Sequence, residues 1–207
     1  MITTTQLRQL EEQAELQGVS AEELMDNAGE QVYLAVRKRC DLRDKRIIIF
    51  AGQGNNAGDG FVAAGHFVKD NSVLIFFFGH KEKLSEAALE NYEKVRKKVN
   101  IIPIHQQEDL AYFHVQDSLQ LVLIDALLGI GATGAPREPI ATGIEYFNSL
   151  LGFKVAVDVP SGINPDTGEI PGKVCDVDLI VTFHDLKTGL EQFADKTVVV
   201  DIGFLKN

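Results

Sequence analysis

The 207-residue chain has no tryptophan and only two cysteines, Cys40 and Cys175. The cysteines lie far apart and lack the close spacing of metal ligands, so we expect reduced thiols rather than a zinc site or a disulfide framework. Basic residues are also few: acidic residues outnumber them, the net charge is −10, and no long block of lysine and arginine occurs. Binding to nucleic acid or to an anionic membrane surface is therefore not expected.

Long apolar runs are missing as well. No stretch approaches the roughly 18 apolar residues of a membrane span, and no signal-peptide pattern opens the chain. We therefore expect a soluble, cytoplasmic protein. Hydrophobic residues make up 45% of the chain, enough for a full core at this length. Because no linker, repeat or low-complexity segment interrupts the sequence, residues 1–207 are predicted to form a single domain.

A glycine-rich motif, GQGNNAGDG at residues 52–60, is the most informative stretch. An apolar run at residues 47–51 leads into it, and apolar residues at helical spacing follow it. A strand, a glycine turn and a helix in this order bring backbone N–H groups and a positive helix end to an anionic ligand. The motif fits the GxGxxG/A fingerprint of dinucleotide-binding folds, although a plain tight turn also favours glycine. Three polar side chains exceed what such a turn requires: Asn55, Asn56 and Asp59.

The remaining pattern alternates apolar strands with amphipathic helices. We expect two helices within residues 1–44 joined at Gly18, with residues 26–27 on the polar surface and Gly29 allowing close packing. Several predicted strands are apolar throughout, as in strands buried on both faces. Further strands are predicted at residues 72–78, 101–104, 119–124, 154–157, 179–183 and 197–201, and helices at residues 85–99 and 139–151. The pattern predicts an α/β fold: a Rossmann-like three-layer αβα sandwich with a mostly parallel sheet and two N-terminal helices.

Three aspartates follow separate predicted strands: Asp59, Asp125 and Asp158. Because the carboxyl ends of parallel strands share one edge, we expect these side chains within one pocket. Crowded carboxylates repel one another, so either one is protonated or a cation lies among them. Asn56 and Ser161 would add neutral oxygen ligands, which suit a hard cation rather than zinc. Charge counting leaves both a monovalent ion and magnesium open.

The second predicted strand ends in Gly79-His80-Lys81. Dinucleotide-binding dehydrogenases place an acidic residue near this point to bind the adenosine ribose. The basic residues here would better receive a 2′-phosphate, and an ordinary solvated loop is an equally good reading.

Taken together, these motifs resemble those of the YjeF N-terminal domain family, the NAD(P)HX epimerases. The matching elements are MxxAG at residues 25–29, GxGNNGGDG at 52–60 with Ala57 in place of a glycine, DALxGxG at 125–131, REP at 137–139, DxPSG at 158–162, DTG at 166–168 and TFxxxKxG at 182–189. They span nearly the whole chain, and their combination is highly specific.

The resemblance implies an isomerase that interconverts the R and S epimers of hydrated NADH and NADPH at carbon 6 of the nicotinamide ring. A dehydratase, expected on another chain, would then repair the S form, and a homodimer is compatible with the resemblance. Potassium would be bound by Asn56, Asp125 and Ser161. The implied substrate contacts are Asn55, Asn56, Ala57, Gly58, Asp59, Gly129, Ile130, Gly131, Ala132, Thr133, Gly134, Ala135, Asp158 and Lys187.

Epimerisation requires a proton donor and acceptor near the ring, whether the hydroxyl leaves or the ring opens. Asp158 is our first choice for proton transfer and Asp59 the second, because no Ser/His/Asp relay is evident. Two other functions stay open. An NADP-dependent oxidoreductase would use the same glycine loop, but it would not need the polar residues at positions 55, 56 and 59. A non-catalytic scaffold module would not need the three aspartates.

Overall fold

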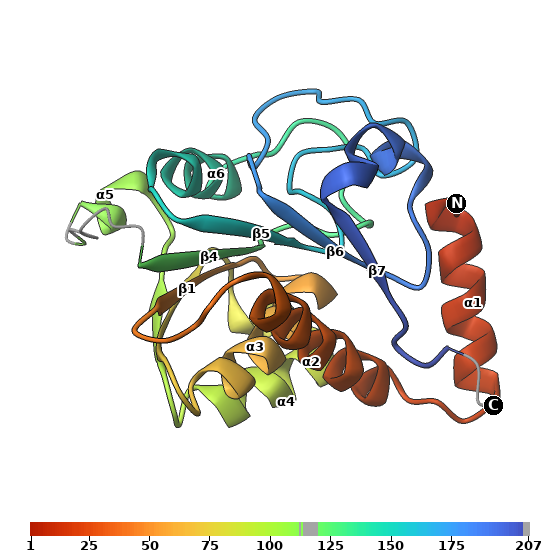
Figure 1. Ribbon diagram of the computed structural model, residues 1–207, viewed down its shortest axis with the longest axis horizontal. Coiled ribbons are helices and arrows are strands. Elements are labelled where there is room, and N and C mark those ends of the chain that lie inside the picture. The colour runs from red at the N-terminus through yellow and green to blue at the C-terminus, as the bar shows by residue number, and fades with distance from the viewer. Residues whose placement is uncertain (112, 114–119, 205–207) are drawn as a thin grey trace.

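The computed structural model describes residues 1–111, 113 and 120–204. Its centre is one sheet of seven parallel strands in the order β3-β2-β1-β4-β5-β6-β7 (Figure 1). The strands are β1 Arg46–Ala51, β2 Ser72–Phe77, β3 Asn100–Pro103, β4 Leu121–Ala126, β5 Phe153–Val157, β6 Leu179–Phe183 and β7 Thr197–Val200. The predicted α/β fold is confirmed, and every pairing of these strands is parallel. Residue 119, where a predicted strand began, lies outside the described residues.

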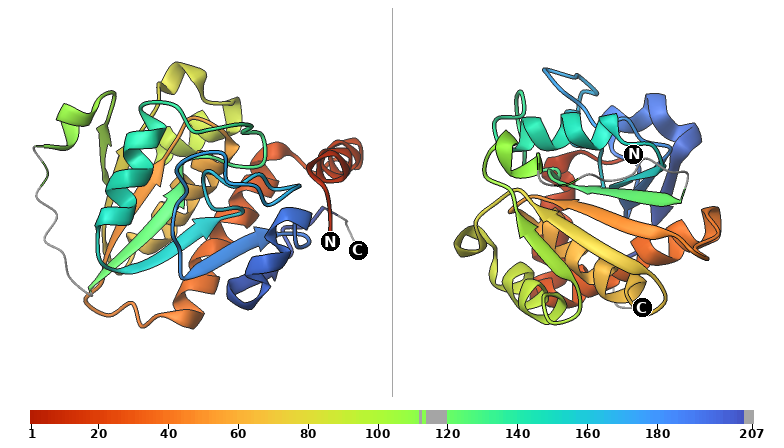
Figure 2. Two further views of the ribbon diagram at one scale, coloured as in Figure 1. Left: turned by 90° about the horizontal axis from the view of Figure 1, so that it is seen from above. Right: turned by 90° about the vertical axis from the view of Figure 1, so that its left-hand side faces the viewer.

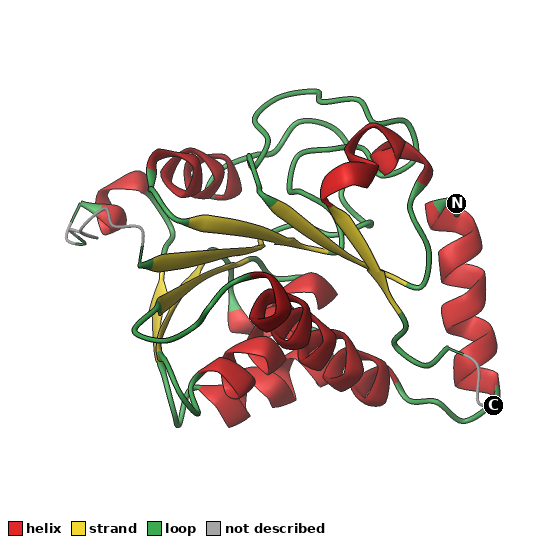
Figure 3. Ribbon diagram, in the orientation of Figure 1, coloured by secondary structure: helices red, strands yellow, loops and turns green. Residues whose placement is uncertain are grey.

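Helices cover both faces of the sheet, which gives the predicted three layers (Figure 3). The helices are α1 Thr4–Leu16, α2 Ala21–Arg39, α3 Asn55–Phe67, α4 Glu86–Val95, α5 Gln107–Leu110 and α6 Ile140–Ser149, with 3₁₀ segments η1 Lys81–Lys83 and η2 Thr188–Lys196. In Figure 1, α2, α3 and α4 lie below the sheet and α6 lies above it. Helix α1 stands at one side of the sandwich (Figure 2).

Strand β1 shows why the apolar runs of this sequence form central strands. Ile47 and Ile49 belong to the core beneath α2 and α3, whereas Ile48 and Phe50 belong to the core beneath α6. Successive side chains of a strand point to opposite faces, so a strand covered on both sides must be apolar at every position. The predicted burial on both faces is confirmed for this strand.

The N-terminal helices bear out one local prediction and correct another. Gly29 lies where α2 meets α3, and a Cβ atom there would lie 2.4 Å from the Cβ atom of Val62, so the predicted close packing is confirmed. The prediction that Asn27 belongs to the polar surface is wrong. Its Nδ2 donates a hydrogen bond of 2.9 Å to the carbonyl of Ile202, so it ties α2 to the segment after β7.

The chain leaves β1 and β4 in opposite directions along the sheet, which opens a crevice between their carboxyl ends. The two exits nearly touch: the Gly52 amide donates to the Ala126 carbonyl at 3.0 Å. A Cβ atom on Gly52 would lie 1.9 Å from the Leu127 carbonyl oxygen, so this position requires glycine. The first glycine of the motif therefore allows the chain after β1 to pass close to the chain after β4.

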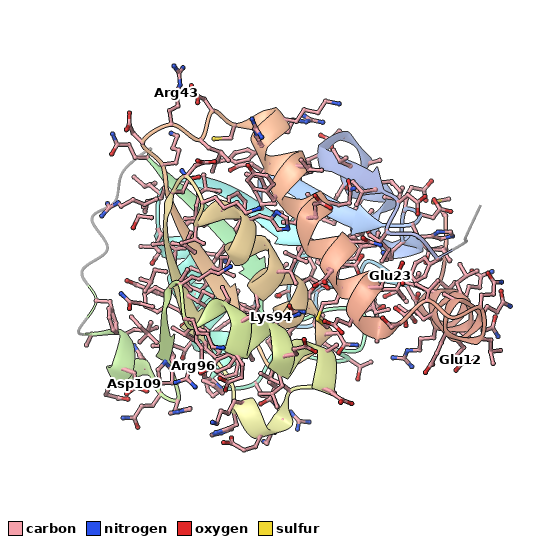
Figure 4. The ribbon with its side chains drawn as sticks, turned by 90° about the horizontal axis from the view of Figure 1, so that it is seen from below. Glu12, Glu23, Arg43, Lys94, Arg96 and Asp109 are labelled. Carbon is pink, nitrogen blue, oxygen red and sulfur yellow. The ribbon has the colours of Figure 1, made fainter. Side chains whose placement is uncertain are left out.

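Charged residues occupy the outer surface of the helical layer. Lys94 on α4 pairs with Glu22 of α2 at 2.9 Å, and Arg96 pairs with Glu93 at 3.0 Å. Figure 4 shows Lys94 and Arg96 on this face. Both side chains are about half exposed, so this side of α4 is a solvated face. Among the described residues, no helix combines the length and apolar character needed to cross a membrane.

Candidate functional site

A cavity of about 1370 Å³ lies over the carboxyl edge of the sheet, at the crevice between β1 and β4. Its walls come from the two ends of the chain as well as from the middle. Residues that line it belong to α1, the start of α3, the loop after β2, the loop at residues 127–140, the end of β5 and residues 202 and 204. This is the place where ligands bind in open parallel sheets, and the volume suits a large ligand.

Helix α3 begins at Asn55, inside the glycine-rich motif, and no side chain caps its N-terminus at Gly54. The first N–H groups of a helix have no acceptor within the helix, so this end can receive an anion. Asn55 accepts a hydrogen bond from the Ser85 hydroxyl at 2.8 Å, and Asn56 Nδ2 donates to the Leu128 carbonyl at 2.8 Å. Both asparagines line the cavity. Asn55 ties the start of α3 to the segment at Ser85, and Asn56 ties it to the loop that contains Leu128.

Ala57 and Gly58 do not line this cavity, and their role as direct contacts stays a prediction. Ala57 is fully buried, and its amide bonds to the Gly54 carbonyl at 3.0 Å. A Cβ atom on Gly58 would lie 2.3 Å from the Met25 sulfur. Position 58 is therefore small because α2 packs against it, and the alanine at position 57 points its methyl group into the core.

The second glycine-rich loop forms the opposite rim. Residues 129–135 all line the cavity, and their contact with substrate stays a prediction. The loop approaches the α3 N-terminus closely, since a Cβ atom on Gly129 would lie 3.2 Å from the Asn56 Cβ atom. Backbone of both rims is thus within reach of one ligand.

Asp125 lies at the same sheet edge but not in the cavity, so the prediction that all three aspartates line one pocket is wrong for this residue. Its side chain is fully buried. Oδ1 accepts from the Ser161 hydroxyl at 2.6 Å and the Leu127 amide at 3.1 Å, and Oδ2 accepts from the Ser161 amide at 2.8 Å. Burial raises the pKa of Asp125, and these hydrogen bonds oppose that shift.

Asn56, Asp125 and Ser161, the expected potassium ligands, meet around one carbonyl group. The Leu128 carbonyl accepts from Asn56 Nδ2 at 2.8 Å and lies 3.4 Å from the Ser161 hydroxyl. The oxygens gathered here are one carboxylate, one hydroxyl and one backbone carbonyl, and the Asn56 side-chain amide contacts that carbonyl through its nitrogen. Oxygen ligands of this kind suit a hard cation rather than zinc. Within the described residues, no group of three or more His, Cys, Asp or Glu side chains is arranged to bind a metal.

Asp158 follows β5 and lines the cavity. Its backbone is left-handed, with φ of +63°, which is uncommon for a residue with a side chain. Its Oδ1 accepts from the Thr182 hydroxyl at 3.1 Å, from the Phe183 amide at 3.2 Å and from the Lys187 ammonium group. The carboxylate is therefore held firmly from the side of the sheet.

Lys187 does not line the cavity, and its role as a substrate contact stays a prediction. Its side chain is fully buried beneath Asp158. Lys187 Nζ donates to the Thr182 hydroxyl and to the Phe183 carbonyl, both at 2.9 Å, in addition to Asp158. Its contacts in this structure are with the protein.

Asp59 reaches the same cavity from the first turns of α3. It is 8% exposed, and no described residue donates a hydrogen bond to its carboxylate. Desolvation raises the pKa of Asp59 well above its usual range, and the negative charges of Asp158 and Glu11 raise it further. Asp59 and Asp158 therefore share one space but have opposite surroundings, one unpaired and the other in an ion pair.

Helix α1 contributes residues that sequence reasoning missed. Arg8 and Glu11 both line the cavity. Burial beside the cavity wall raises the pKa of Glu11, and the charge of Asp158 adds to this shift. The only sequence signal was the amphipathic pattern of the helix, which does not show what its polar face meets. Thr182, which contacts both Asp158 and Lys187, was also missed as a functional residue.

The chain has a crevice at the carboxyl edge of an all-parallel sheet, and a helix N-terminus and two carboxylates lie in the wall of this crevice. These features place it among doubly wound α/β proteins. A family model described as the YjeF-related protein N-terminus matches residues 21–189. The chain belongs to this family.

Similar proteins cover nearly all of the chain. A protein of Nitrosopumilus maritimus named NAD(P)H-hydrate epimerase is 33% identical over 198 residues, 95% of this chain and 90% of that protein. A bifunctional NAD(P)H-hydrate repair enzyme Nnr of Hyperthermus butylicus is 38% identical over 98% of this chain, but the chain spans only 38% of that protein's length. The crystal structure of the yeast protein ynu0 shares the fold, with a TM-score of 0.82 and 22% identity over 97% of this chain and 87% of that one.

Proposed function

We propose that this protein is an isomerase that interconverts the R and S epimers of hydrated NADH and NADPH. Membership of the family and the name of the Nitrosopumilus relative support the activity. The observation that carries the proposal is the pair formed by Asp59 and Asp158, two carboxyl groups in different electrostatic surroundings at one cavity. Two carboxyl groups whose environments differ in this way are suited to act as acid and base.

The reaction needs the carbon 6 hydroxyl to leave one face of the ring and water to arrive on the other. The ring nitrogen donates its lone pair as the C–O bond breaks. We assign Asp59, whose burial favours the protonated form, as the acid that protonates the departing hydroxyl to water. Asp158, which forms an ion pair with Lys187, accepts a proton from the incoming water as the new C–O bond forms. A ring-opened intermediate would use the same two groups.

The pyrophosphate of the substrate is proposed to lie between the two rims. The uncapped N-terminus of α3 and the loop at residues 129–135 present backbone to this space. The carboxylates cannot provide this contact, because they would repel the diphosphate. Residues Asn55 and Asn56 are proposed to contact the substrate as well as to hold the rims together.

Potassium is proposed to bind at Asn56, Asp125 and Ser161. The support is the donor set described above, together with the buried charge of Asp125, which a monovalent cation would neutralise. When bound, the ion would supply a fixed positive charge beneath the loop at residues 129–135. Ser161 already binds the Leu128 amide at 2.8 Å, so this site and the rim of the cavity are directly linked.

The adenosine end of the substrate is proposed to lie near the loop after β2. Gly79 and His80 line the cavity there, whereas Lys81, also considered from the sequence, does not. His80 stacks on His105 with ring centroids 4.9 Å apart. Because basic residues occur at this end, we propose that it binds a 2′-phosphate better than a bare ribose.

The proposed function includes a separate dehydratase, a cytoplasmic location and a single domain over residues 1–207. The name of the Hyperthermus relative joins repair activities in one protein, and this chain spans the smaller part of it. A homodimer is likewise a proposal. The alternative of an NADP-dependent oxidoreductase is disfavoured because Asp59 and Asp158 at the cavity have no part in hydride transfer.

One experiment tests the activity directly. Purified protein is mixed with R-NADHX, and the ratio of epimers is followed by chromatography against an identical sample without protein. Faster approach to the equilibrium ratio is expected. A rate equal to that of the protein-free sample would reject the proposed function. Oxidation or reduction of an alcohol or aldehyde with bound intact cofactor would instead support the oxidoreductase.

A further inference from the structure

Lys187 is the only lysine among the fully buried large side chains of the described structure, and it lies directly beneath Asp158. An ammonium group has three hydrogens, and here each has a fixed acceptor: Asp158 Oδ1, the Thr182 hydroxyl and the Phe183 carbonyl. A buried lysine with all its donors satisfied is held rigidly, because any movement would leave a charge without partners.

The backbone of Lys187 is fixed as well. Ile2 forms a parallel bridge with Lys187, donating to the Leu186 carbonyl at 2.9 Å and accepting from the Thr188 amide at 3.2 Å. The N-terminal segment therefore clamps the chain on both sides of the lysine. The ammonium group cannot turn toward the cavity without breaking its own three hydrogen bonds.

The hydrogen bonds around Asp158 have a definite direction. The Thr182 hydroxyl accepts from Lys187, so its own hydrogen is available to Asp158 Oδ1 at 3.1 Å. All donors to this carboxylate that the structure describes converge on Oδ1. Oδ2 is therefore the oxygen left for a ligand in the cavity. The lysine, with Thr182, determines which carboxylate oxygen faces the substrate.

We propose that Lys187 is a positioning residue for Asp158: it orients Oδ2 into the cavity and supplies the positive charge that keeps this carboxylate ready to accept a proton. The proposal rests on the proposed function of Asp158 as a base. It replaces direct contact of Lys187 with substrate, because the ammonium group lies behind the carboxylate and not in front of it.

Two other acidic side chains face Asp158, so a nearby cation is needed to balance their negative charge. Asp59 approaches from α3 and Glu11 from α1, and both are electrostatically coupled to Asp158. Arg8 lies near Glu11 on the same helix, at the wall of the cavity. Without Lys187, three carboxyl groups would meet with no buried cation among them.

The first variant is Lys187→Met, compared with Lys196→Met as a matched control. Lys196 also donates to a backbone carbonyl, that of Val177 at 2.8 Å, but it lies outside the cavity wall. For Lys187→Met we expect kcat to fall by about 10²-fold or more with KM nearly unchanged. The control should keep both kcat and KM.

A double variant separates positioning from an independent role. If Lys187 acts through Asp158, then adding Lys187→Met to Asp158→Asn should lower kcat no further. An additional loss in that background, or a rise in KM alone, would overturn the proposal. Thr182→Val keeps both charges and removes one contact to each of them, so it serves where Lys187→Met does not fold. It should lower kcat by roughly tenfold.

A stability measurement tests the ion pair without any activity. Lys187→Met leaves the buried Asp158 carboxylate without its cation, so its melting temperature should fall below that of the wild type, and adding Asp158→Asn should recover part of the loss. A double variant that melts no higher than Lys187→Met would contradict the proposal. If the wild type does not epimerise R-NADHX, the proposed function fails, and this measurement still decides whether Lys187 balances the charge of Asp158.

Discussion

Asp166 holds Thr4 with two hydrogen bonds, one from the amide to Oδ1 at 2.7 Å and one from the hydroxyl to Oδ2 at 2.6 Å. The two residues are 162 positions apart in the chain. Thr4 is the first residue of α1, and α1 carries Arg8 and Glu11 into the cavity wall. The aspartate of the DTG element therefore anchors one wall of the cavity to the body of the protein.

Asp166→Ala should loosen α1 and weaken substrate binding more than it slows turnover. The loss of two hydrogen bonds to a charged group corresponds to roughly 1–3 kcal/mol for docking of the helix. Hydrogen exchange of α1 amides and KM are the measurements, with Thr167→Ala as the neighbouring control. Unchanged exchange in α1 would show that other contacts hold the helix.

Asp59→Asn should stabilise the protein at neutral pH and abolish most of its activity. The folded-state pKa of Asp59 lies above the unfolded value, so protonated Asp59 favours folding fully below the unfolded pKa, and this stability is lost as pH rises through the folded pKa. The amide resembles the protonated form at every pH. Its melting temperature should therefore exceed that of the wild type at pH 8 and match it near pH 3.5.

The control for this variant is Asp26→Asn, because Asp26 is exposed on α2. It should not change the pH dependence of melting. If Asp59→Asn were less stable than the wild type at pH 8, the carboxylate would have a stabilising partner, and its assignment as the acid would be wrong.

Asp158→Asn should keep substrate binding but lower kcat by about 10²- to 10⁴-fold. The amide keeps the size of the side chain but does not accept a proton from water. Rates must be compared with protein-free samples because the hydrate epimerises slowly by itself. Near-normal turnover would move the proton-transfer role to Asp59 alone, and failure to bind would make Asp158 a ligand contact first.

Potassium chloride should raise the melting temperature more than lithium or tetramethylammonium chloride at equal concentration. Binding of an ion to the folded state alone stabilises that state by mass action. Asp125→Asn should remove the difference between the salts while keeping the shape of the buried side chain. A wild-type protein that responds equally to all three salts would rule out a specific potassium site.

Gly52→Ala should destabilise the protein strongly, whereas Gly54→Ala should be nearly neutral for folding. The new methyl group at position 52 would lie 1.9 Å from the Leu127 carbonyl oxygen, while position 54 has no atom within 4 Å. Overpacking at such a site costs typically 1–3 kcal/mol and occasionally more. Urea unfolding compares the two variants, and equal midpoints would contradict the close approach of the two loops.

The strands and most helices could be predicted because burial on two faces leaves a continuous apolar run. The apolar segments that become β1 and β6 show this directly, since residues 179–183 are the observed strand to the residue. The edge position of β3 also followed from its proline, because a proline cannot donate a ladder hydrogen bond.

The site could be predicted only as far as strand ends reveal it. The shared sheet edge of Asp59, Asp125 and Asp158 followed from parallel topology. Whether a carboxylate at this edge faces the cavity depends on the hydrogen-bond donors around it. The Ser161 amide and hydroxyl hold the Asp125 carboxylate away from the cavity, and the sequence spacing of the two residues does not reveal this contact. Glu11 was beyond reach because it lies on α1, a helix outside the alternating pattern of strands and helices.

The distance in sequence between Asp158 and Lys187 has a consequence for the protein as it is made. The lysine follows the aspartate by 29 residues, so during synthesis on a ribosome the aspartate leaves the exit tunnel first. Until β6 and the next turn have emerged, the nascent chain has no cation to place beneath Asp158. The edge of the sheet then holds an uncompensated carboxylate, which resists burial. Docking of β5 with Asp158 buried is therefore favoured only once Lys187 itself has left the tunnel.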